Sequence, residues 1–344
     1  MYKRILVPLD GSLRAERALP LAADLARAGS GEVILASVVT EPTYLRREED
    51  QPPTAEAVLA GERETAMRSV EDVSQRLELA GVTTQMEVRV APTVAPALLD
   101  IMQMVHADLV IMCSHGRTGF QRWTLGSVAQ KITRQATVPT LVLRADGPDL
   151  MRATGDGPRS VCALVPLDGS SEAEMALEPA ARLVSAVAAP GQGALHLLHV
   201  VQLEDATHTA LNARQSLQQE AECYLRQVAE RLALAPLASL SLTVSWSVIF
   251  DPDVAAAVLE QSTDHGCDMI AMGSHGRSGF QLWALGSVTE RVLQSTALPL
   301  LIVRSDSATT QLDACGAKER QVDHEMLAWP GYEPTQAPTK TPTR

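Results

Sequence analysis

Two short sequence motifs carry groups that suit a phosphorylated ligand, and each motif occurs twice. The first is Leu6-Val-Pro-Leu-Asp-Gly-Ser12, which recurs unchanged from Leu164 to Ser170. The carboxylate of Asp10 or Asp168 is able to accept hydrogen bonds from ribose hydroxyls or from an adenine amino group. The alternative is that each Asp caps the helix that follows, because Asp is a favoured N-cap residue. The motif alone leaves both roles open.

The second motif joins closely spaced glycines to a glycine-serine pair. In the second copy, Gly273-Ser-His-Gly276 is followed after nine residues by Gly286-Ser-Val288. Glycines let the backbone approach phosphates closely. A helix that begins at Gly286-Ser287 attracts anions through its free N–H groups, and Arg277 adds a charge-assisted bond. Residues 114–128 match residues 274–288 at twelve of fifteen positions, so both copies are predicted to bind phosphates.

The elements that must position these motifs alternate between strand and helix. The motifs recur at offsets of 158 and 160 residues, a period long enough for duplicated domains. In the first copy we expect strands at 4–9, 32–39, 83–90, 108–113 and 139–144. The expected helices between them are at 12–28, 54–80, 94–105 and 126–136. In the second copy the strands are expected near 161–167, 194–201, 242–249, 268–273 and 299–304.

This alternation predicts an α/β protein with an open, parallel, doubly wound, Rossmann-like sheet in each copy. In such sheets the ligand lies beyond the carboxyl ends of the strands, where the strand order reverses. Both motifs directly follow predicted strands. We also expect Ser12, Ser170, Thr93 and Asp253 to cap helices.

The combined pattern GxxG, nine residues, then G[ST], with an early VPxDGS segment, resembles the ATP-binding signature of the universal stress protein family. The resemblance implies a five-stranded sheet in the order 3-2-1-4-5 and a dimer formed through the fifth strands. It implies bound ATP, with any Mg²⁺ held through the phosphates and no metal site from the protein alone. It places Cys113 where the first glycine of the motif is expected, which puts the first site in doubt.

The residues that the resemblance and the motifs assign to nucleotide binding fall into two sets. In the first copy they are Pro8, Asp10, Val38, Met112, Gly116, Arg117, Gly126, Ser127 and Val128. In the second copy they are Pro166, Asp168, Val200, Met272, Gly273, Ser274, His275, Gly276, Arg277, Gly286, Ser287 and Val288. In each set the Pro, the Asp and the first Val (Val38 or Val200) would line the adenosine end, and the methionine would adjoin the ribose. The glycines, Ser127, Ser287, Val128 and Val288 would hold the phosphates. No residue is predicted to be catalytic.

The domains are expected at residues 1–145 and 159–304, joined by a linker at 146–158. The last strand of each domain is apolar and would be an exposed sheet edge, so we expect the two to pair within one chain as a pseudo-dimer. A further homodimer stays open. Residues 305–344 show no sustained period and are predicted to be disordered.

Several functional classes are disfavoured. The net charge is −12 and aromatic residues make up 3%, which does not suit nucleic-acid binding. No apolar stretch approaches 20 residues, so a cytoplasmic protein without a membrane segment is expected. The five cysteines have no CxxC spacing, which favours buried or incidental thiols over a disulfide framework or a zinc site. The P-loop, dinucleotide and nucleophile-elbow motifs are absent.

Three functions remain. The first is an ATP-binding stress protein in which the nucleotide switches conformation or partner affinity. The second is a slow ATP hydrolase, for which no repeated acidic residue beside the glycine loop supplies a water-orienting group. The third is a nucleotide-free interaction scaffold. His115 and His275 flank the motif glycines. Because no nucleophile or metal-ligand set accompanies them, a role in structuring the loop is favoured over catalysis.

Overall fold

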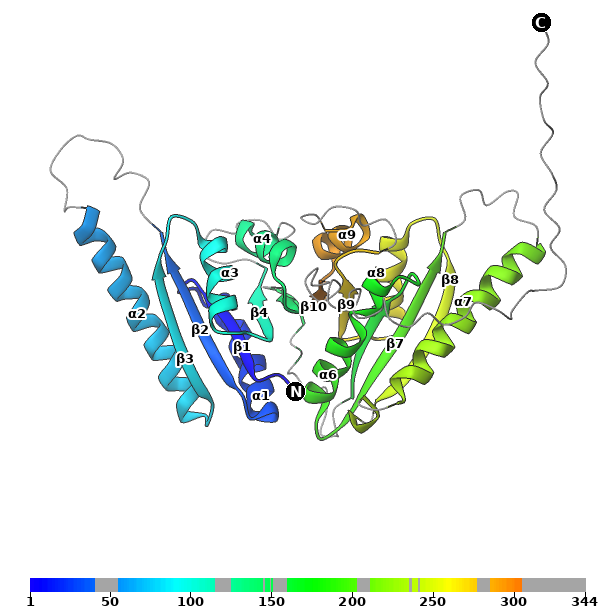
Figure 1. Cartoon of the computed structure of the whole chain (residues 1–344), viewed down its shortest axis with the longest axis horizontal. Coiled ribbons are helices and arrows are strands. Elements are labelled where there is room, and N and C mark those ends of the chain that lie inside the picture. The colour runs from blue at the N-terminus through cyan, green and yellow to red at the C-terminus, as the bar shows by residue number, and fades with distance from the viewer. Residues whose placement is uncertain are drawn as a thin grey trace, which may run out of the picture. The chain divides into compact units, whose positions relative to one another are not determined.

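The computed structural model describes residues 1–40, 55–114, 125–144, 146–148, 150, 160–202, 211–234, 237–240, 242–276 and 285–304. The predicted tail at 305–344 and most of the predicted linker lie outside these residues. Within them the chain forms a ten-stranded sheet with the order β3-β2-β1-β4-β5-β10-β9-β6-β7-β8. Each half therefore has the order 3-2-1-4-5 (Figure 1). The predicted fold class, an α/β tandem of two parallel five-stranded sheets, is confirmed.

The first half has five strands: β1 (Arg4–Leu9), β2 (Glu32–Val39), β3 (Thr83–Val90), β4 (Leu109–Cys113) and β5 (Thr140–Leu143). Its helices are η1 (Ala15–Ala18), α1 (Leu19–Gly29), α2 (Ala55–Leu79), α3 (Val94–Met104) and α4 (Ser127–Gln135). The helix expected at 12–28 thus begins later, with a 3-10 turn, because Pro20 stands in the first turn of α1.

The second half has five strands: β6 (Ser160–Pro166), β7 (Gln192–Val201), β8 (Thr243–Phe250), β9 (Met269–Gly273) and β10 (Leu300–Val303). Its helices are α5 (Ser171–Glu174), α6 (Leu177–Ala188), α7 (Leu211–Leu232), η3 (Leu237–Leu240), α8 (Val254–Asp264) and α9 (Ser287–Ser295). The predicted caps Ser170 and Asp253 accept bonds from the amides of Ala173 and Ala256. Thr93 occupies the N-cap position of α3 but makes no such bond.

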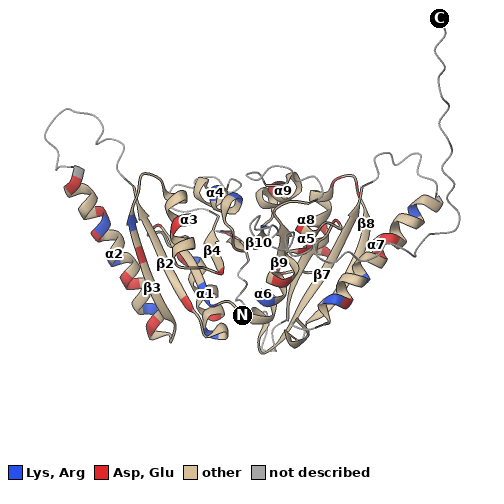
Figure 2. Cartoon of the chain, viewed as in Figure 1, with Lys and Arg blue, Asp and Glu red and all other residues tan. Residues whose placement is uncertain are grey.

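Helices cover both faces of the sheet. Because successive side chains of a strand point to opposite faces, alternate residues are buried in different apolar layers. Ile5 and Val7 belong to a cluster with α1 and α2, whereas Leu6 and Ile34 pack with α3 and α4. The layer that holds α1 and α2 continues into α6 and α7 of the second half. On the outer helices α2 and α7, basic and acidic residues are interspersed (Figure 2). These helices therefore offer no continuous basic surface.

The two halves join through their last strands. β10 pairs antiparallel with β5, with Leu301 opposite Leu141. All eight residues of the two strands are buried. Arg134 of α4 and Glu290 of α9 form an ion pair across the joint at 2.5 Å. Each half thereby covers the apolar strand edge of the other.

Arg144 ties β5 of the first half to α9 of the second. Its Nε donates to the carbonyl of Thr296 at 2.9 Å, and a second guanidinium nitrogen donates to the carbonyl of Leu293. These carbonyls lie at the C-terminal end of α9, where a cation is favoured. Burial lowers the pKa of Arg144, and the two carbonyls solvate its buried charge.

Arg144→Ala is expected to lower the free energy of unfolding by about 1.5 kcal/mol, the lower end for bonds to a charged group. Urea unfolding followed by circular dichroism measures the change. Arg68→Ala is the matched control, because Arg68 pairs with Glu64 on the exposed face of α2 and such pairs contribute little. Equal midpoints for the two variants would show that Arg144 does not stabilise the joint.

Candidate functional site

The predicted site residues gather where the strand order of each half reverses. Strands β1 and β4 are neighbours in the first half, and β6 and β9 in the second. Asp10 follows β1 and Asp168 follows β6, while the glycine motifs follow β4 and β9. Because parallel strands end at the same edge, each carboxylate lies on the edge from which the glycine loop starts.

The Asp-Gly-Ser turn has the same geometry in both halves. Asp10 Oδ1 accepts from the amide and hydroxyl of Ser12 at 3.0 and 2.6 Å. Asp168 Oδ1 does the same with Ser170 at 3.0 and 2.5 Å. The intervening Gly169 has φ +85°, which only glycine adopts without strain. The turn fixes the direction of each carboxylate.

These bonds bear on the capping role considered for the Asp. The residue that caps the following helix is the serine: Ser170 Oγ accepts from the amide of Ala173 at 3.2 Å. In the first half Ser12 Oγ accepts from the amide of Ala15, also at 3.2 Å, but the N-cap of η1 is Arg14, so the prediction that Ser12 caps this helix is wrong. The carboxylate of Asp168 orients the capping Ser170, and that of Asp10 holds Ser12 in the same way.

Asp168 and Gly276 lie against each other. A Cβ atom built on Gly276 would stand 2.2 Å from Asp168 Oδ2 and 3.2 Å from its Cγ. No side chain larger than hydrogen fits there unless the carboxylate moves. The structure therefore brings together the two motifs of the second half. Four predicted or candidate positions, His115, Gly116, Arg117 and Arg277, lie outside the described residues.

The second glycine of each motif starts a helix. Gly286 is the N-cap of α9, and its amide donates to the carbonyl of Ser274 at 2.8 Å. Gly126 is the N-cap of α4 and bonds to Ser114 at the same distance. Neither helix has a side-chain cap bond. The first amides of both helices, at Ser127 and Ser287 onward, are thus oriented to receive an anion.

His275 lies inside the glycine loop of the second half. Its Nδ1 is 3.1 Å from Ser274 Oγ, which restrains the ring. Its Nε2 is buried and has no hydrogen-bond partner in the part of the chain that is described. A buried ring nitrogen without a partner is costly, and a polar ligand at this loop would supply one.

The apolar side chains of the predicted sites pack with the cores beneath α3 and α8. Met112 and Met272 are each 5% exposed and pack in the clusters beneath α3 and α8. Val38, Val128, Val200 and Val288 are half-buried against the same two clusters. Pro8 and Pro166 lie in β1 and β6, two residues before the aspartates. These residues share the switch point with the polar motifs.

Cys113 and Gly273 end the equivalent strands β4 and β9 but have different surroundings. Burial raises the pKa of the Cys113 thiol to about 11, and the thiol lies near Arg17 and the backbone of Ala18. It belongs to the apolar layer of α1 and α2. Gly273 has no positive φ, which excludes the backbone-strain explanation for glycine at this position. A Cβ there would instead stand 2.4 Å from the carbonyl oxygen of Glu172.

One contact in the site was not foreseen from the sequence. Thr289 Oγ1 donates to the carbonyl of Gly273 at 2.9 Å, which links α9 to the end of β9. The first copy has Ala129 at the equivalent place. This mismatch between the repeats is the signal that points to Thr289.

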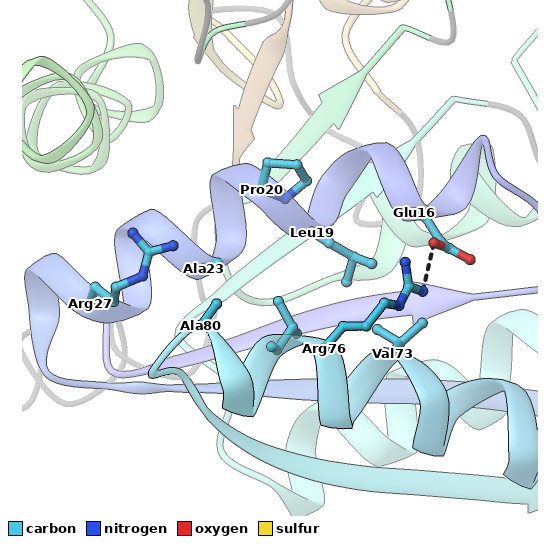
Figure 3. A pocket seen from close by; sticks show the side chains of 9 residues that line it. Glu16, Leu19, Pro20, Ala23, Arg27, Val73, Arg76 and Ala80 are labelled. Atoms are coloured by element: carbon cyan, nitrogen blue, oxygen red, sulfur yellow. Dashed lines mark hydrogen bonds and ion pairs between the residues drawn. The ribbon is translucent and has the colours of Figure 1, made fainter.

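A groove of about 280 Å³ lies between α1 and α2 (Figure 3). No predicted site residue lines it. Its arginines are paired, Arg76 with Glu16 at 2.9 Å and Arg27 with Asp24 at 2.5 Å. Its polar groups are therefore already satisfied by neighbouring side chains.

The described residues contain no group of three or more His, Cys, Asp or Glu placed to hold a metal ion. Nor do they include a helix whose length and apolar character would let it cross a membrane.

Comparison with known proteins identifies the family. A universal stress protein of Mycobacterium tuberculosis is 30% identical over 235 residues, which cover 66% of this chain and 72% of that protein. One from Mycolicibacterium smegmatis is 27% identical over 322 residues, or 87% and 96%. The crystal structure of a universal stress protein from Archaeoglobus fulgidus shares the fold, with a TM-score of 0.57 at 19% identity, over 88% of this chain and 98% of that one. The model of the universal stress protein family matches residues 1–144 and 163–304, and the chain therefore belongs to that family, with two such domains in tandem.

Proposed function

We propose that this chain binds adenine nucleotide, ATP in particular, at the strand ends of each half. The observation that carries the proposal is the contact of Asp168 with Gly276, which joins an oriented carboxylate to a glycine loop. A ribose presents hydroxyls, and the phosphate chain attached to it presents anionic oxygens. Carboxylates accept from the hydroxyls, and loop amides donate to the oxygens.

The residues present fit the nucleotide. In the second half, Pro166, Asp168 and Val200 would hold the adenosine end, with Met272 beside the ribose. The loop amides from Gly273 to Gly276 and the first amides of α9 would hold the phosphates. His275 Nε2 would gain the partner that it lacks. Mg²⁺, where present, would bind through the phosphates.

The nucleotide would act as a switch because the helices that receive it meet across the joint. Gly126 and Gly286 of the two motifs are the N-caps of α4 and α9, and the Arg134–Glu290 ion pair connects these helices. A nucleotide bound at one site would shift its helix, and the ion pair would pass that shift to the other half. In this proposal the chain is a built-in dimer through β5 and β10, and bound ATP changes the surface that it offers to partners.

Mass spectrometry of the nucleotide released from denatured protein tests the proposal. ATP is expected, either as purified or after soaking. ADP that accumulates with time would favour the slow hydrolase. If no nucleotide is found after soaking and a calorimetric titration shows no heat, the proposal fails and the nucleotide-free interaction scaffold is the function that is left. The double variant Asp10→Ala/Asp168→Ala should lose binding, whereas Asp100→Ala, which removes an exposed carboxylate from α3, should keep it.

A chain that ends at Asp306 is expected to bind ATP as the full chain does. The residues after Asp306 lie outside both repeats, and their composition supports no core. Calorimetric titration of the two chains checks this. A loss of more than about tenfold, roughly 1.4 kcal/mol, would show that the tail contributes to a site.

A further inference from the structure

Two cysteines that are far apart in sequence meet in the second half. Cys162 lies in β6 and Cys267 lies two residues before β9. Their Sγ atoms are 3.5 Å apart. A disulfide bond is about 2.0 Å long, so the sulfur atoms need to approach by roughly 1.5 Å. Rotation of the two cysteine side chains about their Cα–Cβ bonds supplies a movement of this size.

The backbone on both sides of the pair is held firmly. The carbonyl of Cys162 accepts from the amide of Asp268 at 2.8 Å, and the amide of Cys162 donates to Asp268 Oδ2 at 2.8 Å. The amide of Cys267 donates to the carbonyl of Ser262 at the end of α8. The two thiols therefore stay adjacent instead of meeting by chance.

The first half has the same frame without the thiols. There Arg4 and Asp108 exchange the corresponding bonds, at 2.9 and 3.1 Å. Arg4 stands at the position of Cys162, and Ala107 at the position of Cys267. The fold accordingly does not require cysteine at either place. The thiol pair is a property of the second half alone.

The two thiols differ in their surroundings. Cys162 is partly exposed, whereas Cys267 is 6% exposed. A hydrogen bond between the two thiols lowers the pKa of Cys162. That same hydrogen bond, together with burial, raises the pKa of Cys267. Cys162 is thus the more reactive of the two, since the thiolate is the nucleophile.

We propose that Cys162 and Cys267 form a reversible disulfide when the protein meets a hydroperoxide. The Cys162 thiolate attacks the peroxide oxygen, the O–O bond breaks, and hydroxide leaves, so that Cys162 becomes a sulfenic acid. Cys267 sulfur then attacks Cys162 sulfur, and the sulfenic oxygen leaves as water with the Cys267 proton. In sum, two thiols and one hydrogen peroxide give one disulfide and two waters. A dithiol reductant reverses the reaction.

The crosslink leaves the proposed nucleotide site open. Both cysteines lie toward the N-terminal ends of β6 and β9, while Asp168 and Gly273 lie at or beyond the opposite ends. Oxidation would fasten together the two strands that carry the second site. Detection of the disulfide does not depend on ATP binding. The disulfide proposal and the ATP-binding proposal are therefore able to fail independently.

Peptide mapping of the full chain under non-reducing conditions tests the proposal. After treatment with dilute hydrogen peroxide, a peptide that links Cys162 to Cys267 is expected, and dithiothreitol should remove it. Titration of the unfolded chain should find three free thiols instead of five. Peroxide that leaves both thiols free, or that links either to another cysteine, would overturn the proposal.

Single variants separate the two steps. In Cys267→Ser, a dimedone adduct is expected on Cys162, because the sulfenic acid has no neighbour to attack it. In Cys162→Ser, Cys267 should stay unmodified. Cys223→Ser is the matched control: it removes an exposed thiol of α7 and should leave the crosslink intact. Equal dimedone labelling of Cys162 in the wild type and in Cys267→Ser would show that Cys267 does not resolve the sulfenic acid.

Discussion

Gly276→Ala is expected to weaken ATP binding at the second site by at least about tenfold. The added Cβ would lie 2.2 Å from Asp168 Oδ2, a separation that no two such atoms tolerate. Either the loop or the carboxylate must move, and overpacking of this kind costs about 1–3 kcal/mol. A cost of about 1.4 kcal/mol corresponds to a tenfold change in affinity. Calorimetric titration with ATP measures the change site by site.

The control for this prediction is Gly61→Ala. Gly61 lies in α2, and a Cβ built there meets no atom within 4 Å. This variant should bind ATP as the wild type does. Thermal unfolding of both variants shows whether they remain folded. Should folded Gly276→Ala keep the wild-type affinity, the carboxylate and the glycine loop would not act as one site.

Much of the fold could be predicted from the sequence because periodicity and burial coincide. The strands expected at 4–9, 32–39 and 83–90 match β1, β2 and β3 residue for residue. The order 3-2-1-4-5 came from the family resemblance, since alternation alone does not determine which strands are neighbours. The start of the first helix was predicted wrongly, because Pro20 has no amide to continue the hydrogen-bond ladder and a 3-10 turn precedes α1.

The site was predictable at the level of motifs but not of contacts. Repetition identified Asp10, Asp168 and the glycine pairs, because a duplicated chain retains what each copy uses. The approach of Gly276 to Asp168 spans more than a hundred residues and depends on the register of β6 with β9. The same register creates the Cys162–Cys267 pair. Cysteine spacing along the chain carries no signal of it.

The two halves are expected to bind ATP unequally, with the second site at least about fivefold tighter. Cys113 replaces the first glycine of the motif in the first half, and its thiol occupies space beside Ala18, in the segment that follows Asp10. We expect the thiol to act on the first site through crowding of this segment, since Cys113 has no positive φ and hence no backbone strain of that kind. A cost of about 1 kcal/mol gives a fivefold difference in affinity. Calorimetry should resolve two classes of site in the wild type.

Placing a cysteine at position 273, as in the first half, is expected to lower both stability and ATP affinity strongly. In Gly273→Cys, the new Cβ would stand 2.4 Å from the carbonyl oxygen of Glu172 and 3.1 Å from the Cα of Ala173. Both are backbone atoms of α5, so the helix that follows Asp168 must shift, at a cost of about 2–3 kcal/mol. Urea unfolding should show this loss, and the second site should weaken by tenfold or more.

Cys113→Gly is the reciprocal variant, and its two readouts move in opposite directions. Removal of a buried thiol from the layer of α1 and α2 leaves a small void, which costs about 1 kcal/mol of stability. The first site should nevertheless bind ATP more tightly, because the Asp10 turn is relieved of its neighbour. A wild type with two equal sites, which neither substitution alters, would contradict the asymmetry. If the two sites of the wild type differ in ATP affinity and Cys113→Gly does not reduce the difference, its cause lies elsewhere in the first half.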